Sequence, residues 1–281
     1  MTLNKKLLAG LVAFAAASTS AQAVTVAAND GWTLGVSGQV NQFVSFVNDD
    51  NATNGDNQTI SNGLLPNVLK FSMTAPTING LDMAAHVSFN PSMNENTSGI
   101  EHREVYFTVD GSFGQILAGK TLGLYGSHNI ATEQTIYGVG WAPQAEDGTS
   151  LGGIGLGYDY ASWRSQVRWT SNDMNGFKIA VAVLQAAGTD TRLVADLPTG
   201  SLNATTASED LRYEADLSYA GAFDGGSYSA WLSGAIQDHD KALGFAEDAR
   251  YWTVGATATI GGFELMAQYS DAEDSIADVT A

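Results

Sequence analysis

Cysteine is absent from this chain of 281 residues, and proline occurs only five times. Without cysteine, no disulfide framework can hold the fold together, so its stability must come from packing and hydrogen bonding. The few prolines, together with 31 glycines and 10% aromatic residues, fit a chain composed of many strands.

Basic residues are also scarce, because 12 lysines and arginines face 30 aspartates and glutamates and give a net charge of -18. This balance argues against nucleic acid as a partner, and against any partner recruited by a broad positive field. After residue 23, no stretch reaches the roughly 18 consecutive apolar residues of a membrane-spanning helix. Composition alone describes an acidic soluble protein, so the order of the residues has to decide the fold.

The first residues have the pattern of an export signal. Lys5 and Lys6 are basic, residues 7–17 form an apolar run, and residues 21–23 (Ala-Gln-Ala) form a small-residue cleavage site. This order predicts a secretory signal peptide over residues 1–23 and a mature chain that begins at Val24. A membrane anchor is the alternative, but the apolar run is too short to span a bilayer.

Polar and apolar residues alternate along much of the remaining chain. In the segment 102–120, Val105, Phe107 and Val109 alternate with polar neighbours, and glycines at 111 and 114 then allow a tight turn. A sustained period of two predicts strands. The pattern predicts no helix and about 11 strands, two in this hairpin and the others at residues 32–47, 69–74, 81–90, 164–171, 177–185, 211–219, 228–237, 250–260 and 263–270.

The connections alternate between short turns and long polar loops, of which residues 121–162 form the longest. This asymmetry, with aromatic residues near the strand ends, predicts an all-β, transmembrane up-and-down antiparallel β-barrel. A soluble β-sandwich also alternates, with its polar face turned to solvent, so alternation alone does not exclude it. The long strands and the strict alternation of connection lengths favour the barrel.

Two groups of short motifs stand out in the chain: residues 103–109 (REVYFTV), Gly111, Phe113-Gly114 and Gly119-Lys120, then 164–169 (RSQVRW) and Asn175-Gly176-Phe177. They resemble motifs of the general porins of Gram-negative bacterial outer membranes, which are trimeric barrels of 16 strands, and the similarity runs along the whole mature chain. The first group corresponds to the family's arginine-bearing strand, its glycine turn and the start of its third loop, and the second to the strand and turn that follow that loop. Lys120 stands where the family usually has arginine.

The resemblance implies a porin-like barrel in the outer membrane, in contact with outer-membrane lipid and associated as a homotrimer. It also implies a water-filled channel for passive diffusion of small hydrophilic solutes and ions. About 11 strands is an odd count, whereas bacterial single-chain barrels have even counts. Such porins also end in an aromatic residue, whereas residues 278–281 are Asp-Val-Thr-Ala. We therefore expect one barrel domain, residues 24–281, that is incomplete at its C-terminus.

In this family, the long third loop folds into the lumen, and its acids face bases on the wall. The resemblance implies the same role for the loop 121–162. Strand parity turns several bases toward the lumen, and the motif adds Arg103, although alternation with Val105 places Arg103 on the outer face. The expected constriction residues are Lys70, Arg103, Arg164, Arg168, Arg212, Glu133, Glu146 and Asp147.

The sequence contains few signs of a catalytic site. The four histidines are scattered without the spacing of metal ligands, so we expect no metal, no cofactor and no catalytic residues. An outer-membrane barrel that serves as an enzyme, or an adhesin with its function in the loops, remains an alternative beside the soluble sandwich. The sequence leaves the solute and the charge selectivity of the channel open.

Overall fold

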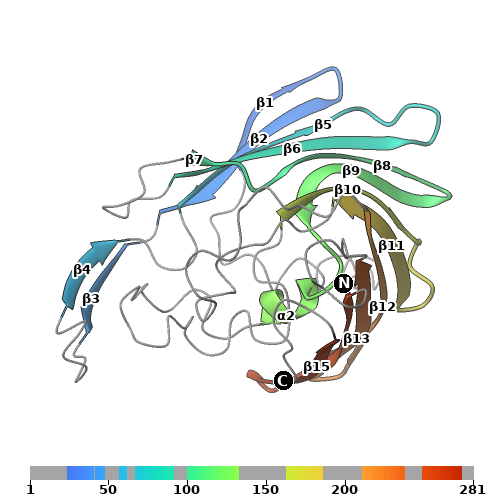
Figure 1. The fold of residues 1–281 in the computed structure, drawn as a ribbon. Coiled ribbons are helices and arrows are strands. Elements are labelled where there is room, and N and C mark those ends of the chain that lie inside the picture. The colour runs from blue at the N-terminus through green and yellow to red at the C-terminus, as the bar shows by residue number, and fades with distance from the viewer. Residues whose placement is uncertain are drawn as a thin grey trace, which may run out of the picture.

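The computed structural model of the protein describes residues 24–40, 42–47, 57–61, 67–91, 100–132, 163–185, 211–237 and 249–273. Within them, one antiparallel sheet follows the chain, and each strand of its main path pairs with the strands before and after it (Figure 1). The path consists of β1 (Val24–Asn29), β2 (Trp32–Gln39), β5 (Val68–Thr74), β6 (Asp82–Pro91), β8 (Val105–Gly111), β9 (Gly114–Leu122), β10 (Trp163–Thr170), β11 (Phe177–Gln185), β12 (Leu211–Phe223), β13 (Gly226–Gln237), β14 (Ala249–Ile260) and β15 (Phe263–Glu273). The all-β, up-and-down order expected from the alternation is confirmed.

The sheet is strongly curved, and a short helix, α2 (Ser127–Thr132), lies on its concave side (Figure 1). In the described part of the chain, the two outermost strands, β1 and β15, do not pair with each other, so the sheet is open. We call the concave face, which carries Arg212 and Asp216, the inner face, and the opposite face the outer face. No helix in the described residues is long and apolar enough to cross a membrane.

The polarity of the two faces of the sheet is the reverse of that in a soluble protein. On β12, the outward Tyr213 is 55% exposed, whereas its inward neighbour Arg212 is 1% exposed. On β11, Val181 and Val183 are exposed in the same way and alternate with the buried Ala180, Ala182 and Leu184. A soluble β-sandwich turns its apolar side chains inward, so the sandwich alternative is wrong. Apolar residues that cover the outside and polar residues that cover the inside are the pattern of a transmembrane barrel.

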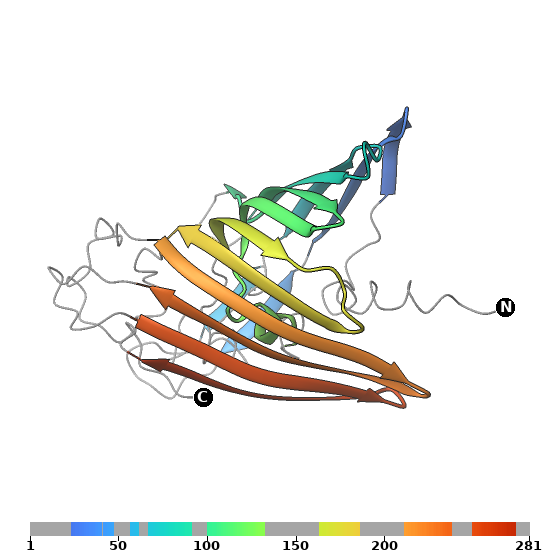
Figure 2. The same ribbon diagram turned by 90° about the vertical axis from the view of Figure 1, so that its right-hand side faces the viewer.

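Tight turns join the strands at one end of the sheet (Figure 2). Between β10 and β11, Asn175 and Gly176 adopt positive φ angles of 59° and 97°, which are the angles that a two-residue hairpin turn requires. An aromatic row follows the same end. Phe177 lies 4.3 Å from Tyr219, and Tyr219 lies 5.8 Å from Tyr228, as ring centroid distances. Such a row is typical of the aromatic girdle at a membrane surface.

The first part of the sheet differs from the expected strands. The expected strand 32–47 is divided, because β2 ends at Gln39, where its partner β5 begins at Val68. The following residues form β3 (Phe43–Val47), which pairs with β4 (Asn57–Ser61) in a separate two-stranded sheet, and β4 lies within the expected loop 48–63. A two-residue strand, β7 (Ile100–Glu101), pairs beside β6.

The expected number of strands was too low. β1 adds a strand before the first expected one, because Asp30 and Gly31 adopt positive φ angles and turn the chain back on itself. The main path therefore has twelve strands, and its outermost strands run in opposite directions. Twelve is an even number, so the expected odd count is wrong. The expectation of no helix is also wrong, because α2 forms after β9.

Candidate pore constriction

The residues that follow β9 turn back along the inner face of the sheet. Glu214 holds the first of them, because one of its carboxylate oxygens, Oε2, accepts the backbone N–H groups of Leu124 at 2.5 Å and Tyr125 at 3.1 Å. The other oxygen, Oε1, accepts a hydrogen bond of 2.7 Å from Nε of Arg212. At Gly123, an added Cβ would lie 2.5 Å from the Glu214 carboxylate. A glycine here lets the backbone approach the wall closely.

Helix α2 is fastened to three strands by one buried side chain. The amide nitrogen of Asn129 donates to Oγ1 of Thr253 at 3.0 Å and to Oγ of Ser270 at 3.5 Å. Its amide oxygen accepts a hydrogen bond of 3.1 Å from Nε1 of Trp231. Asn129 is 1% exposed. Three partners for one buried amide define the position of the helix, because a lost partner would leave a buried polar group unsatisfied.

A second side chain of α2 contacts β12 and β13. Nε2 of His128 lies 3.0 Å from a carboxylate oxygen of Asp216, and its ring stacks on Trp231 with centroids 5.3 Å apart. Beside this contact, the guanidinium of Arg212 lies 4.8 Å from the ring centroid of Tyr251. The helix therefore covers part of the inner face of β12, β13 and β14, and narrows the space in front of that face.

Another polar cluster lies on the inner face of the earlier strands. Nζ of Lys70 and the carboxylate of Glu104 form an ion pair of 2.9 Å, and Oγ1 of Thr121 donates to the same carboxylate at 3.4 Å. On the neighbouring strand, the ring of His86 stacks on Tyr106 with centroids 4.8 Å apart. The wall of the early strands thus combines a base, an acid and hydroxyl groups, which suits contact with water.

The structure distributes the expected wall bases over different environments. Lys70, Arg164 and Arg168 share the inner face by register. Arg212 also has this parity, but it is buried beneath the segment 123–132 and paired with Glu214.

Arg103 lies apart from these bases. Its Nε is 2.9 Å from Glu101, and its guanidinium lies 4.2 Å from the ring centroid of Trp163. Trp163 has the parity opposite to Arg164 on β10. The expected loop acids Glu133, Glu146 and Asp147 lie outside the described residues.

Sequence reasoning missed the acids of the wall itself. Glu104, Glu214 and Asp216 each accept an inward hydrogen bond or ion pair, and they share the inward parity of the expected bases other than Arg103. Parity was the available signal, because each of these acids stands between two outward residues. His128 and Asn129 carried no such signal, since they lie on a helix that the alternation did not predict. In the described residues, no group of histidines and acids is arranged to hold a metal ion.

An apolar outer face, a polar inner face and a chain segment folded against that inner face define a transmembrane β-barrel channel. The chain belongs to the Gram-negative porin family, whose model matches residues 8–281. It is an outer-membrane porin that forms a water-filled channel for passive diffusion of small hydrophilic solutes and ions. Nothing in the comparisons or in the described residues supports an enzyme or an adhesin.

Solved porin structures are similar to this chain in fold. OmpF of Salmonella typhi, in a complex with daunomycin, matches with 15% identity and a TM-score of 0.57 over 90% of this chain and 72% of its own. The anion-selective porin from Comamonas acidovorans matches with 17% identity and a TM-score of 0.49 over 86% of this chain and 80% of its own. No curated protein sequence matches the chain.

Proposed function

We propose that the segment 123–132 and the loop that follows it form the constriction of this channel. The observation that carries the proposal is the set of bonds from Glu214, Asp216 and Thr253 to this segment. They hold a piece of chain inside the curve of the sheet, where it takes up part of the lumen. Solutes that pass must then move between this segment and the inner face of the earlier strands, which carries Lys70.

The constriction has bases and acids in close pairs. Lys70 is paired with Glu104, and Arg212 with Glu214, so each pair presents little net charge. Arg164 and Arg168 add positive charge to the wall, while Glu133, Glu146 and Asp147 add negative charge from the loop. With a net charge of -18 over the whole chain, an acidic mouth raises the local concentration of cations. We therefore assign a weak cation preference to the channel, strongest at low salt.

The path to the membrane and the assembly belong to the same proposal. Residues 1–23 act as the signal peptide, and residues 24–281 belong to the barrel domain. The subunits associate as a homotrimer in contact with outer-membrane lipid. The signal-peptide pattern supports the export route, and membership of the porin family supports the assembly and the contact with lipid.

A cysteine scan tests the constriction, since the chain has no cysteine of its own. Ala131 lies on α2 and is partly exposed, so Ala131→Cys presents a thiol next to the proposed path. A bulky water-soluble thiol reagent added to single channels in a planar bilayer should reduce their conductance. The matched control, Val181→Cys, lies on the outer face, and its channels should not respond. Equal responses of both variants would show that α2 does not line the path.

A further inference from the structure

Two hairpin turns of the sheet contain the dipeptide Asn-Gly in matching positions. One is Asn79-Gly80, between β5 and β6, and the other is Asn175-Gly176, between β10 and β11. Both asparagines have positive φ angles, of 54° and 59°, and in each turn the residues on either side of the dipeptide form a β-bridge. The two turns therefore have similar backbones, and their hydrogen bonds to the surrounding residues can be compared directly.

The dipeptide Asn-Gly is chemically reactive, because glycine has no side chain that shields its backbone nitrogen. This nitrogen can attack Cγ of the asparagine, so that a new N–Cγ bond forms and the Cγ–Nδ2 bond breaks. The proton of the attacking N–H passes through water to the departing group, which leaves as ammonia. A water molecule then opens the cyclic imide, and the product is either aspartate or isoaspartate, in which the chain continues through Cγ.

In the second turn, the attacking nitrogen is already engaged. The backbone N–H of Gly176 donates a hydrogen bond of 3.1 Å to the carboxylate of Asp173. The carbonyl oxygen of Gly176 accepts a hydrogen bond of 3.0 Å from the backbone N–H of Ala220 on the neighbouring strand β12. To reach Cγ of Asn175, the nitrogen has to leave the first bond, and the turn has to move against the second.

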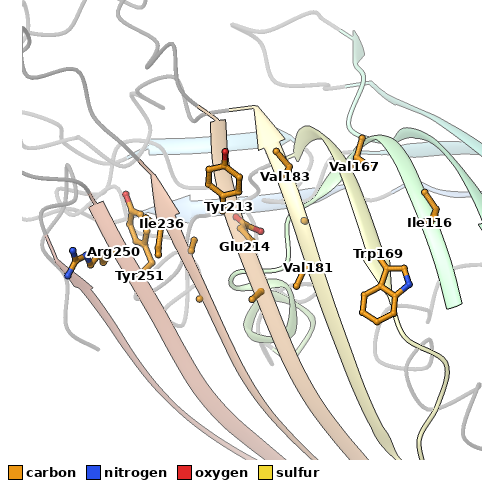
Figure 3. Close-up of a pocket in the computed structure, with 14 residues that line it drawn as sticks. Ile116, Val167, Trp169, Val181, Val183, Tyr213, Glu214, Ile236, Arg250 and Tyr251 are labelled. Carbon is orange, nitrogen blue, oxygen red and sulfur yellow. The ribbon is translucent and has the colours of Figure 1, made fainter. Parts of the chain in front are cut away.

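Neighbouring residues hold the same turn in place. Asn172, just before it, donates from its side-chain amide to the carbonyl oxygen of Ser112 at 2.9 Å. Trp169, on the outer face of β10 (Figure 3), donates from Nε1 to the carbonyl oxygen of Phe113 at 2.8 Å. Ser112 and Phe113 form the turn between β8 and β9, so two adjacent hairpins are joined beside Asn175.

The first turn has no such restraint from the residues that the structure describes. Among them, the backbone N–H of Gly80 has no hydrogen-bond partner, and a Cβ added to Gly80 would meet nothing within 4 Å. Thr77 stands at the position that corresponds to Asp173, but its hydroxyl donates to the carboxylate of Asp82 at 2.5 Å. Over the same described ranges, no hydrogen bond joins residues 76–81 to another hairpin.

We propose that Asn79 is a site of spontaneous deamidation in the folded protein, and that Asp173 protects Asn175 from the same reaction. Asn79 and Gly80 are both exposed, so water reaches the turn for the second step. In outer-membrane barrels, the short turns lie on the periplasmic side. The reaction therefore adds a negative charge to the periplasmic rim of the barrel. The proposal rests on the geometry of the turns and does not depend on the constriction.

Peptide mapping of the full chain, folded in detergent and incubated at mildly alkaline pH, tests this site. Samples are digested in acid, where deamidation is slow, and chromatography with mass spectrometry separates the asparagine, aspartate and isoaspartate forms. Each rate is divided by the rate of the same site in the denatured chain. Asn79 should then react about tenfold faster than Asn175, because a hydrogen bond to a charged group has to break only at Asn175. Equal normalised rates, or a faster Asn175, would overturn the proposal.

The role of Asp173 is tested by Asp173→Ala, which releases the N–H of Gly176. This variant should accelerate Asn175 about tenfold and leave Asn79 unchanged. Asp224→Ala is the matched control, because it removes an exposed acid from the turn between β12 and β13, and it should change neither rate. If Asp173→Ala has no effect, or if both variants accelerate Asn175 equally, the hydrogen bond does not protect this site.

The reverse exchange introduces protection at the first turn. Thr77→Asp is combined with Asp82→Asn, so that no second acid stands beside the new carboxylate. The double variant should deamidate at Asn79 about tenfold more slowly than Asp82→Asn alone. Both changed side chains are exposed, so the fold should tolerate them, and the comparison within the wild type needs no variant. An equal or faster rate in the double variant would contradict the protective geometry.

Discussion

Trp231 and Asn129 are 102 residues apart in the chain and are joined by a hydrogen bond of 3.1 Å from the indole nitrogen to the side-chain amide oxygen. Both side chains are almost fully buried. This bond connects the wall of the barrel to the helix inside it. The position of the helix, and with it the width of the channel, therefore depends on contacts between residues that are distant in sequence.

The first prediction concerns the fastening of α2. Asn129→Ala removes two donated hydrogen bonds and leaves the indole N–H of Trp231 without its acceptor. A buried polar group that loses its partner costs about 1–3 kcal/mol, so the helix should detach from the wall part of the time. Single-channel recordings should then show larger and noisier conductance. Asn172→Ala, in an exposed turn, is the control and should behave as the wild type. Unchanged recordings for Asn129→Ala would show that this contact does not hold the constriction.

The second prediction compares two ion pairs of the wall. Arg212 and Glu214 have side chains that are 1% and 2% exposed, whereas those of Lys70 and Glu104 are 23% and 26% exposed. Glu214→Gln removes the carboxylate that pairs with the buried Arg212 and binds the backbone of Leu124 and Tyr125, and should destabilise the fold by about 3–5 kcal/mol. Glu104→Gln should cost about 1 kcal/mol or less, because water still reaches that pair. Denaturant unfolding of both variants in detergent measures the difference, and equal losses of stability would contradict it.

The third prediction concerns charge selectivity. Arg168 lies on the inner face, and its Nε is buried without a hydrogen-bond partner in the described residues. Removal of this charge by Arg168→Ala should move the reversal potential, measured across a salt gradient, toward cation selectivity. The shift should grow as salt falls, because the screening length increases from about 3 Å at 1 M to about 30 Å at 0.01 M. Arg250→Ala, on the outer face, should leave the reversal potential unchanged. A larger shift for Arg250→Ala would contradict the assignment of the two faces.

The fourth prediction tests which face meets lipid. Val181 lies at the middle of β11 on the outer face and is 47% exposed. Val181→Arg should destabilise the membrane-inserted barrel by about 2–4 kcal/mol, the cost of a basic side chain near the bilayer midplane. Val181→Leu keeps the surface apolar and should be tolerated. Unfolding from lipid vesicles measures both variants, and a harmless Val181→Arg would mean that this face does not contact hydrocarbon.

Much of the fold was predictable from local pattern. The alternation around Val105, Phe107 and Val109 specified strands, because successive side chains of a strand point to opposite faces. The same parity placed Arg168 and Arg212 on one face of the sheet, and the register confirms that position. Apolar residues on the other parity, with short turns at one end only, were sufficient to indicate a membrane barrel.

Local pattern failed where the chain leaves the sheet. Residues 32–47 alternate throughout, yet β2 stops at Gln39, because its partner strand β5 begins only at Val68. The helix α2 spans six residues, which is too short to show a helical period against the polar sequence around it. Strand parity also does not predict which inward base forms an ion pair with an acid.

The sequence by itself determined the class of protein, because alternation, export signal and turn chemistry are properties of neighbouring residues. The tertiary structure alone decided that Glu214 binds the backbone of Leu124 and Tyr125, and that Asn129 reaches Trp231. These pairs are separated by about 90 to 100 residues, so no periodicity connects them, and they form only when the sheet curves and brings its inner face around the helix. The physical reason is that strand order is set by local hydrogen bonding between neighbouring strands, whereas the channel is set by contacts across the space that the curved sheet encloses.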